Sequence, residues 1–415
     1  MKKRIFLFAV TLSLSVFSAA FGQQSPPRLD LQNIVDTYVR NSLDLQAARY
    51  RLERTKADQI AARLRPNPSI TLAGENLAIS GPTQFSHLYE LSATYTDTIE
   101  LGGKKSLREN SASANISAAE AQFEDTMRRG IAEVKRLYFE ALLARYSVET
   151  ATENRQTFDQ LVQFNRTRFE EGAIPEVELI QVRLERVKFD SSVKQAQVTL
   201  RQATIRLLER LASPVSSSAE VIGDLNFRAE SIDIASLRES ALNVRSDVRA
   251  ALAEVNAAKE RLALERGRAA PDISPFAGYK RVGSDNTLLF GVNVPLKLRD
   301  RNQGEAARAE VDVRAAETKL QLTRNHAMAE LESAYAAVQS ARELVETFQG
   351  ELLQQADESR AITIGAYEEG GTELLPVLEA QRTRSEVRQQ YFKTLFDYQA
   401  SLIALELAAG REIRP

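Results

Sequence analysis

Proline is absent from two long stretches of this 415-residue chain, between Pro82 and Pro175 and between Pro295 and Pro376. Glycine is also sparse there. Because proline breaks helices, the stretches predict two uninterrupted helices, over about residues 104–169 and 302–367. Each would contain about 66 residues and, at about 1.5 Å per residue, would be on the order of 100 Å long. Helices of that length exceed those of ordinary globular domains.

The apolar residues of both stretches follow three-and-four spacing, which is typical of helices that pack along one face. Alanine-rich faces let helices approach closely, and charged residues cover the other faces, as on coiled-coil surfaces. The pattern is carried by Met127, Ile131, Val134, Tyr138, Ala141 and Val148 in the first stretch, and by Val311, Ala315, Leu322, Ala329 and Ala336 in the second.

Shorter helices are predicted on both sides of each long one. Before the long helices they cover about residues 30–40 and 43–65, and their counterparts cover about 234–243 and 246–268. After the first long helix, a helix begins near Pro175 and continues to about Leu211. Its counterpart covers about residues 373–409 and stops at Gly410, a residue type favoured just beyond helix C-termini.

Three landmarks indicate an internal duplication. Phe169-Glu170-Glu171-Gly172 matches Tyr367-Glu368-Glu369-Gly370 at a separation of 198 residues, Pro68-Ser69-Ile70 matches Pro271-Asp272-Ile273 at 203, and Ile99-Glu100-Leu101 matches Val294-Pro295-Leu296 at 195. Each repeat has the order helix, helix, two strands, long helix, turn, helix. We predict a first repeat over residues 23–211, an inter-repeat segment over 212–233 packed against the middle of the helical body, a second repeat over 234–410, and a tail over 411–415.

A pair of strands lies between the short and long helices of each repeat. The predicted strands cover residues 69–79 and about 89–96 in the first repeat, and 272–282 and about 288–296 in the second. Apolar and other residues alternate in them, as in strands with one face toward lipid. The residues predicted to face lipid are Tyr89, Leu91, Tyr95, Leu288, Phe290 and Val292.

The N-terminus has the pattern of a cleaved secretory signal peptide. Lys2, Lys3 and Arg4 precede an apolar run from Ile5 to Phe21, and small residues allow cleavage after Gly22. Residues 1–22 are therefore excluded from the fold, and the mature chain is expected to be exported. No later segment approaches about 18 consecutive apolar residues, so no membrane-spanning helix is expected.

The mature chain carries 51 basic and 56 acidic residues, a net charge of −5. This mildly acidic balance does not indicate nucleic-acid binding. It has no cysteine, and therefore no disulfide, no thiolate metal site and no lipid-bearing cysteine. The two histidines, His87 and His326, are interpreted as ordinary surface residues, and Met127 and Met328 as packing residues. We expect no catalytic residue, no cofactor and no metal site, and hence no enzyme.

Four strands per chain cannot close a barrel, and open strand edges cannot face lipid. Three chains would supply twelve strands, an even number within the range of membrane barrels. We therefore predict a mainly helical protein with a small β part. As a homotrimer it would form a 12-stranded outer-membrane β-barrel on a long periplasmic α-helical barrel.

The chain resembles the TolC-type outer-membrane efflux family over essentially all of the mature sequence. The duplicated order of elements carries the resemblance. Local matches are Arg65-Pro66-Asn67-Pro68 before the first strand pair and Ile99-Glu100-Leu101-Gly102-Gly103-Lys104 after it. The segment from Val294 to Gly304, with its Pro-Leu and Arg-Asn-Gln-Gly elements, resembles the heavy-metal-resistance (CzcC-like) subgroup.

The resemblance implies a passive exit duct of a tripartite efflux system. It would receive substrate, heavy-metal cations in this subgroup, from an inner-membrane pump of the resistance-nodulation-division type through a periplasmic adaptor. It also implies that the two helical turns, over residues 168–179 and 366–379, form the periplasmic mouth and contact the adaptor. The implied mouth residues are Glu170, Glu171, Gly172, Glu176, Glu368, Glu369, Gly370, Glu373 and Glu379.

Gly172 and the pair Gly370-Gly371 are expected to supply the positive φ that a tight helical turn needs. Acidic residues at the turns would form carboxylate rings in a trimer, which favour cations and repel one another. Glu379 matches an acidic position of the family's closed mouth, whereas Pro376 replaces another. The alternative for any single glutamate is simple solvation of an exposed turn.

Two other functions fit parts of the sequence. A duct for drugs or other organic molecules would have the same architecture, since the pump largely selects the cargo. A soluble periplasmic coiled-coil scaffold would explain the long helices and the export signal. It would not explain two alternating strand pairs at matching positions of the repeats.

Overall fold

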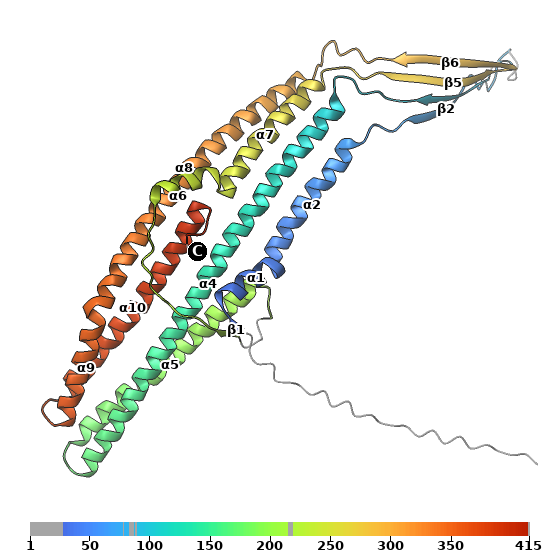
Figure 1. The fold of residues 1–415 in the computed structure, drawn as a ribbon. Helices are drawn as coiled ribbons and strands as arrows, with labels where there is room; N and C mark the ends of the chain where they lie inside the picture. Colours follow the sequence, from blue (N-terminus) through green and yellow to red (C-terminus); the bar gives the residue numbers. More distant parts are fainter. Residues whose placement is uncertain (1–27, 78, 83–86, 88, 215–218, 414–415) are drawn as a thin grey trace, which may run out of the picture.

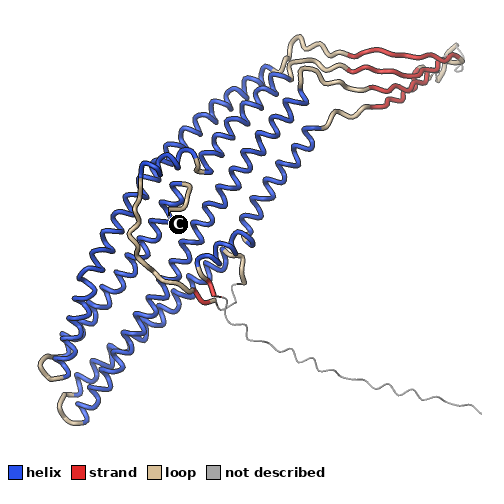
Figure 2. The backbone as a smooth tube through the Cα atoms, in the orientation of Figure 1, coloured by secondary structure: helices blue, strands red, loops and turns tan. Residues whose placement is uncertain are grey.

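The computed structural model describes residues 28–77, 79–82, 87, 89–214 and 219–413, and it shows a curved layer of long helices with a small sheet at one end (Figure 1). The signal peptide predicted over residues 1–22 lies outside the described residues. Figure 2 shows that the long strands extend from one end of the helices and that two helical turns lie at the other end. Within the described chain, no helix is both long enough and apolar enough to cross a membrane.

The first repeat follows the predicted order of elements. Two short helices, α1 (Leu31–Asn41) and α2 (Leu43–Arg63), begin after Asp30 and Ser42, whose side chains accept hydrogen bonds from the free amides of each first turn. Strands β2 (Ser69–Glu75) and β3 (Glu90–Thr96) follow. The long helix α4 (Lys104–Glu170) and helix α5 (Glu176–Arg210) complete the repeat.

The second repeat has the same order, with one difference in its long helix. It comprises α6 (Ile234–Asn243), α7 (Ser246–Gly267), β5 (Ser274–Val282), β6 (Asp285–Asn293), α8 (Gln303–Thr347), α9 (Leu353–Glu368) and α10 (Leu374–Ala409). The prediction of an uninterrupted second long helix was wrong, because a π-helical turn, η1 (Phe348–Leu352), separates α8 from α9. Gly350 lies in this wider turn, where it has no side chain to pack.

Three strands differ from the predicted bounds, and for β2 and β6 the local backbone explains the difference. β2 ends at Glu75, short of the predicted residue 79, because Asn76 adopts a left-handed φ of 55°. β6 begins at Asp285, directly after a turn at Gly283 with φ 55°, and ends at Asn293. Pro295, which lacks an amide hydrogen, lies beyond that end. β5 begins at Ser274 rather than at residue 272.

The four strands form one antiparallel sheet in the order β2-β3-β5-β6. The central pairing, β3 with β5, joins the two repeats, with Leu91 opposite Arg281 and Tyr95 opposite Ala277. The register leaves one edge of the sheet at β2 and the other at β6. Neither edge has a partner strand among the described residues of this chain.

Both long helices begin after a residue in the same unusual conformation. Gly103 has φ 67° and ψ 20°, and Asn302 has φ 65° and ψ 24°. Asparagine tolerates this left-handed region better than most residues. The Asn302 side chain also donates to the backbone oxygen of Glu265 at 2.8 Å and to its carboxylate at 2.9 Å. The repeats therefore enter their long helices by the same backbone turn, made with different residues.

The helices form a single layer. α4 packs against α2 and α5 on one side and against α7 and α10 on the other, while α8 packs against α7 and α10, and α9 against α10. α2 and α7 lie in the half of the layer near the sheet, and α5, α9 and much of α10 lie in the other half (Figure 1). The layer therefore has two lateral edges, one formed by α2 and α5 and the other by α8 and α9.

Residues 219–230, named here the strap, cross the middle of the layer between the repeats. Its short strand β4 (Glu220–Val221) pairs in parallel with β1 (Arg28–Leu29). Side chains of α4 and α10 hold the rest: Tyr138 donates to the backbone oxygen of Ile222 at 2.6 Å, and Tyr398 donates to that of Arg228 at 2.6 Å. The described residues 219–230 therefore contact the middle of the helical body through α4 and α10.

Candidate functional site

The two helical turns at the end of the layer have nearly the same backbone. Gly172 has φ 74° and Gly370 has φ 79°, so the predicted glycines supply the left-handed residue of each turn. Their amides donate to the oxygens of Phe169 and Tyr367, at 2.9 and 3.1 Å. Gly371, the other member of the predicted pair, does not have a positive φ. One residue in the left-handed conformation is enough to form each turn.

The acidic residues of the turns lie on the surface. All the predicted mouth glutamates are exposed: Glu170, Glu171, Glu176, Glu368, Glu369, Glu373 and Glu379. Glu170 pairs with Arg166 on the same helix at 2.9 Å. Glu373 is the N-cap of α10 rather than a helical residue. Pro376 lies in the first turn of α10, where the amides have no helical acceptor and proline is tolerated.

A small apolar cluster holds the two hairpins together just above the turns. Its fully buried members come from both repeats, including Phe158, Val182 and Tyr367. The Tyr367 hydroxyl donates to the Asn165 side chain at 2.5 Å, so α9 is bonded directly to α4. Burial raises the pKa of Tyr367, and Arg168 lies over its ring at 5.5 Å. The described turns are thus fixed side by side within one chain.

Higher on the same hairpins lies a network named here the polar collar. It joins α4, α9 and α10 and consists of Glu153, Asn154, Thr157, Asp357, Arg360, Gln381, Arg384 and Arg388. Gln381 is fully buried and donates to Asn154 at 2.8 Å, and Arg360 donates to Gln381 at 2.6 Å. The pKa of Arg360 is lowered, mainly by burial and also by the nearby charge of Arg384.

The sheet separates apolar from polar side chains. Because paired residues of neighbouring strands share a face, the register places Leu91, Tyr95, Leu288, Phe290 and Val292 on one face. These five are exposed in the single chain, with Phe290 at 86% and Leu288 at 81%. Tyr89, the sixth predicted residue, precedes β3 and is half-buried, with Arg281 over its ring at 5.9 Å.

The opposite face of the sheet is mostly polar. It carries Ser92 and Thr94 of β3, and near the far end it carries an ion pair between Glu90 of β3 and Lys280 of β5. Asn76 also donates to Glu90 at 3.0 Å. A sheet with one apolar and one polar face is typical of a wall between lipid and water.

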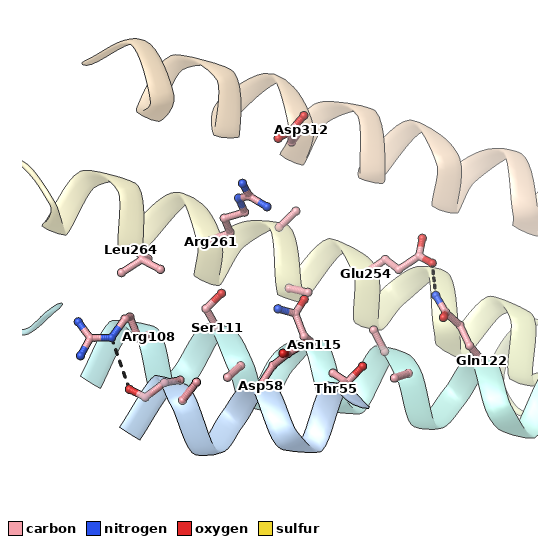
Figure 3. Close-up of a pocket in the computed structure, with 17 residues that line it drawn as sticks. Thr55, Asp58, Arg108, Ser111, Asn115, Gln122, Glu254, Arg261, Leu264 and Asp312 are labelled. Atoms are coloured by element: carbon pink, nitrogen blue, oxygen red, sulfur yellow. Dashed lines mark hydrogen bonds between the residues drawn. The ribbon is translucent and has the colours of Figure 1, made fainter. Parts of the chain in front are cut away.

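A groove of about 770 Å³ lies on one face of the helical layer, in the half near the sheet. Figure 3 shows its side chains converging from four helices: Asp58 from α2, Asn115 and Gln122 from α4, Glu254 and Arg261 from α7, and Asp312 from α8. Alanines form much of the remaining lining. Gln122 donates to Glu254 at 2.7 Å across the groove. Because helices from both lateral edges reach it, this face of the layer is concave.

The side chains of the described residues offer no clustered metal ligands. They contain no group of three or more histidine, aspartate or glutamate side chains arranged to hold a metal ion. His326 is an exposed residue of α8. The site consists instead of turns, a polar network, a two-faced sheet and a concave helical wall.

The model of the outer membrane efflux protein family matches residues 35–212 and 237–411, which together make up most of the chain. The chain belongs to the outer membrane efflux protein family. The resemblance stated from the sequence is therefore confirmed, as is the efflux-channel function at the level of the family. The matched segments cover both structural repeats and leave the strap between them.

Relatives of this outer membrane efflux protein include metal-resistance proteins. The cobalt-zinc-cadmium resistance protein CzcC of Cupriavidus metallidurans is 27% identical over 94% of this chain and 92% of its own length. The nickel and cobalt resistance protein CnrC of the same organism is 28% identical over 71% of this chain and 70% of its own. The crystal structure of the Campylobacter jejuni CmeC outer membrane channel matches with a TM-score of 0.78 at 17% identity, covering 99% of this chain and 93% of that one.

Sequence reasoning missed the polar collar of this outer membrane efflux protein. Its residues are charged or amide side chains on long helices, a pattern that also indicates a solvent-exposed face. One usable signal was present, since Asn154, Thr157 and Gln381 interrupt otherwise apolar helix faces. Only the packing of α4 against α10 shows that these positions meet.

Proposed function

We propose that this chain is one protomer of a homotrimeric exit duct, exported through its signal peptide, that crosses the outer membrane and extends into the periplasm. The observation that carries the proposal is that, in the described part of the chain, both the sheet and the helical layer end in edges without a partner. A sheet with free edges is not stable against lipid, whereas three copies give twelve strands and a closed ring.

The lateral edges of the helical layer support closure by further copies. Exposed apolar side chains gather on the edge helices: Val177, Ile180, Leu184 and Val187 on α5, Leu43, Tyr50 and Ile60 on α2, and Val311, Leu322, Leu344 and Ile362 on α8 and α9. The α5 residues are spaced by three and four, as in a helix packing seam. One edge would therefore pack against the opposite edge of the next copy.

The apolar face of the sheet would then meet lipid through Tyr89, Leu91, Tyr95, Leu288, Phe290 and Val292. The polar face would line the water-filled interior. The turns lie at the far end of the helical layer from the sheet (Figure 1). They would form the periplasmic mouth and the contact with an adaptor protein, and the adaptor would in turn connect the duct to an inner-membrane pump.

At the mouth, the exposed glutamates of the turns would be repeated by threefold symmetry. Rings of carboxylates attract cations and repel each other at short range. The polar collar joins the hairpin of the second repeat to α4. Widening the mouth would therefore require some hydrogen bonds of the collar to break and to form with other partners. We infer that the mouth is closed at rest and that the collar contributes to holding it closed.

Heavy-metal cations are the proposed cargo, because the relatives named above are metal-resistance proteins. The concave wall has no clustered metal ligands among the described residues, which suits a conduit that passes ions without retaining them. The alternative cargo is drugs or other organic molecules. The two cargoes can be distinguished by whether the protein makes a cell resistant to metals or to antibiotics.

The test is a deletion strain grown with zinc, cobalt, cadmium, nickel, copper or common antibiotics, with and without the gene restored. We expect sensitivity to one or more metals in the deletion strain and recovery on restoration. Sensitivity to antibiotics alone would support an organic cargo. Unchanged growth under every condition, with the protein present in the outer membrane of the parent, would contradict the efflux proposal.

A further inference from the structure

Four connections join the helices to the long strands, and they lie together at the end of the layer nearest the sheet (Figure 1). Two of them, residues 97–103 and 268–273, lead to or from the central strands β3 and β5. The other two lead to β2 and from β6, the edge strands of the sheet. We name these two the edge links. They comprise residues 63–68, counted from the last residue of α2, and residues 294–302.

The charges at the central connections are neutralised by ion pairs. Lys104, the first residue of α4, is buried and pairs with Asp272 at 2.6 Å. One turn farther along α4, Arg108 donates to the Glu100 carboxylate at 2.9 Å. The central connections therefore hold each other in place and present little unbalanced charge.

The edge links, in contrast, are basic. Five basic side chains stand there against one acidic residue, Asp300, whose carboxylate accepts from the Asn302 amide at 2.8 Å. The five are Arg63, Arg65, Lys297, Arg299 and Arg301. All except Lys297 are exposed, and none of the five has an ion pair within the described part of the chain.

The Arg-Asn-Gln-Gly element of the sequence builds the second edge link. The Gln303 side chain accepts from the Arg301 amide at 2.7 Å and donates to the Arg299 backbone oxygen at 3.1 Å. The Arg301 Nε donates to the backbone oxygen of Lys297 at 3.3 Å. The amide side chain of the element is thus used to fold the link, whereas both guanidinium groups remain exposed and without a carboxylate partner among the described residues.

Exposed leucines accompany these basic side chains. Leu64 is 63% exposed, Leu296 76% and Leu298 72%. The second edge link also follows directly on β6, whose apolar face ends with Phe290 and Val292. Leucines next to arginines are typical of a segment at a membrane surface, where the apolar groups enter the acyl region and the cations meet phosphates.

We infer that the edge links of neighbouring copies together bind the phosphate headgroup of an anionic phospholipid in the periplasmic leaflet of the outer membrane. The inference rests on the proposed function, because ring closure sets the β6 edge of one copy beside the β2 edge of the next. Arg63 and Arg65 of one copy would then lie beside Lys297, Arg299 and Arg301 of its neighbour. Arginine can bind phosphate through two parallel hydrogen bonds, and each added cation strengthens the attraction.

The test uses the full-length protein in detergent, titrated with dioleoylphosphatidylglycerol or with dioleoylphosphatidylcholine, which has the same acyl chains and no net charge. Native mass spectrometry measures the lipid retained by the assembled protein. We expect the parent to prefer the anionic lipid. The apparent affinity for that lipid should fall about tenfold or more in Arg299→Gln/Arg301→Gln and equally in Arg63→Gln/Arg65→Gln.

The matched control is Arg324→Gln/Arg382→Gln. It removes two exposed arginines of α8 and α10 that also have no ion pair within the described residues, and it should keep the lipid preference. A loss in one edge-link variant but not in the other would overturn the shared site. Equal binding of the two lipids by the parent, or equal loss in the control, would overturn the lipid assignment. Displacement of the lipid by equimolar glycerol 3-phosphate would show a phosphate site that does not require a membrane, and would overturn it too.

A second measurement locates the edge link in the bilayer. The chain has no cysteine, so a single Leu298→Cys can carry an environment-sensitive fluorophore without background labelling. In phosphatidylglycerol-containing vesicles, a spin label at headgroup depth should quench the fluorophore at position 298 but not one at His326→Cys, an exposed position of α8. Phe290→Cys with a spin label on the acyl chain reports insertion of the sheet.

The two labelled positions separate failure of the inference from failure of the proposed function. Quenching at Phe290→Cys without quenching at Leu298→Cys would overturn the inference, and would leave an acidic protein surface as the partner of the edge links. Absence of quenching at both positions would instead contradict the proposed function, because the sheet would not be in the membrane.

Discussion

Arg384 of α10 donates a hydrogen bond to Glu153 of α4 at 2.7 Å, and this contact joins the hairpins of the two repeats. The Arg384 side chain is only 7% exposed, and its Nε also donates to Asp357 of α9 at 2.5 Å. Burial alone would lower the pKa of Arg384, but the bonds to Asp357 and Glu153 raise it above its usual value. The guanidinium is therefore charged, and its charge is stabilised in this buried position by the two carboxylates.

Replacing Glu153 by glutamine should loosen the hairpins, because Arg384 and Arg388 would both lose their shared carboxylate partner. Breaking a buried ion pair costs about 3–5 kcal/mol, and the partial exposure of Glu153 reduces the expected cost to about 1–3 kcal/mol. Hydrogen exchange of α9 and of the α10 segment facing it should become faster. The control, Glu346→Gln, removes the exposed pair with Arg342 and should change stability by less than about 1 kcal/mol. Equal effects of both variants would contradict the role given to the collar.

Alanine at Gly172 or Gly370 should destabilise the corresponding turn by about 1–2 kcal/mol, since an L side chain is strained at a positive φ. Among the described residues, no neighbouring atom lies within 4 Å of a Cβ added at either position, so the cost comes from the backbone alone. Exchange of the amides of Ala173 and Gly371, which close the two turns, is the measurement. Gly365→Ala in α9 is the control and should stabilise the helix by about 0.5–1 kcal/mol. Unchanged exchange in the turn variants would show that the turns do not need the left-handed residue.

The strap should detach at high pH, because burial raises the pKa of Tyr138 from 10.0 to about 12. The folded pKa lies above that of the unfolded chain, so the contribution of Tyr138 is fully present below pH 10. It is lost as the pH rises through about 12. A shift of this size corresponds to roughly 2–3 kcal/mol. Denaturant unfolding across this pH range should show that loss in the parent and a smaller one in Tyr138→Phe. Identical pH profiles would rule out Tyr138 as the titrating group.

Aspartate at Phe290 should impair membrane assembly, whereas aspartate at the neighbouring Leu289 should be tolerated better. The two residues lie on opposite faces of β6, and only Phe290 lies on the apolar face. A charge on a lipid-facing strand position costs on the order of 1–3 kcal/mol. The measurement is the yield of heat-resistant oligomers extracted from the outer membrane. Normal oligomers from Phe290→Asp together with loss from Leu289→Asp would show that the faces are assigned the wrong way round.

Sequence patterns predicted the elements of this fold because long helices and alternating strands depend on local chemistry. The absence of proline from the long stretches and the presence of Gly410 placed the predicted ends of the long helices and of α10 within two residues of the observed ends. The π-helical turn was not predictable in this way, because Phe348–Leu352 has no proline and only one glycine. The π-helical turn lies against α10, where the Gln349 side chain donates a hydrogen bond to the Tyr391 hydroxyl at 3.0 Å.

The candidate site was predicted in part, for a related reason. Turn residues such as Gly172 and Gly370 are identifiable locally, since their conformation depends on the adjacent residues. The polar collar depends on contacts between residues more than 200 positions apart, such as Arg384 and Glu153. The groove of the helical layer likewise depends on residues of four helices, and their side-by-side arrangement cannot be read from the sequence.

The most direct test of the account is the mass of the full-length protein purified from the outer membrane in detergent, corrected for bound detergent. We predict a particle of three chains that precipitates when detergent is withdrawn, because a single copy leaves both the sheet and the helical layer open. A folded single chain that stays in solution without detergent would contradict the account.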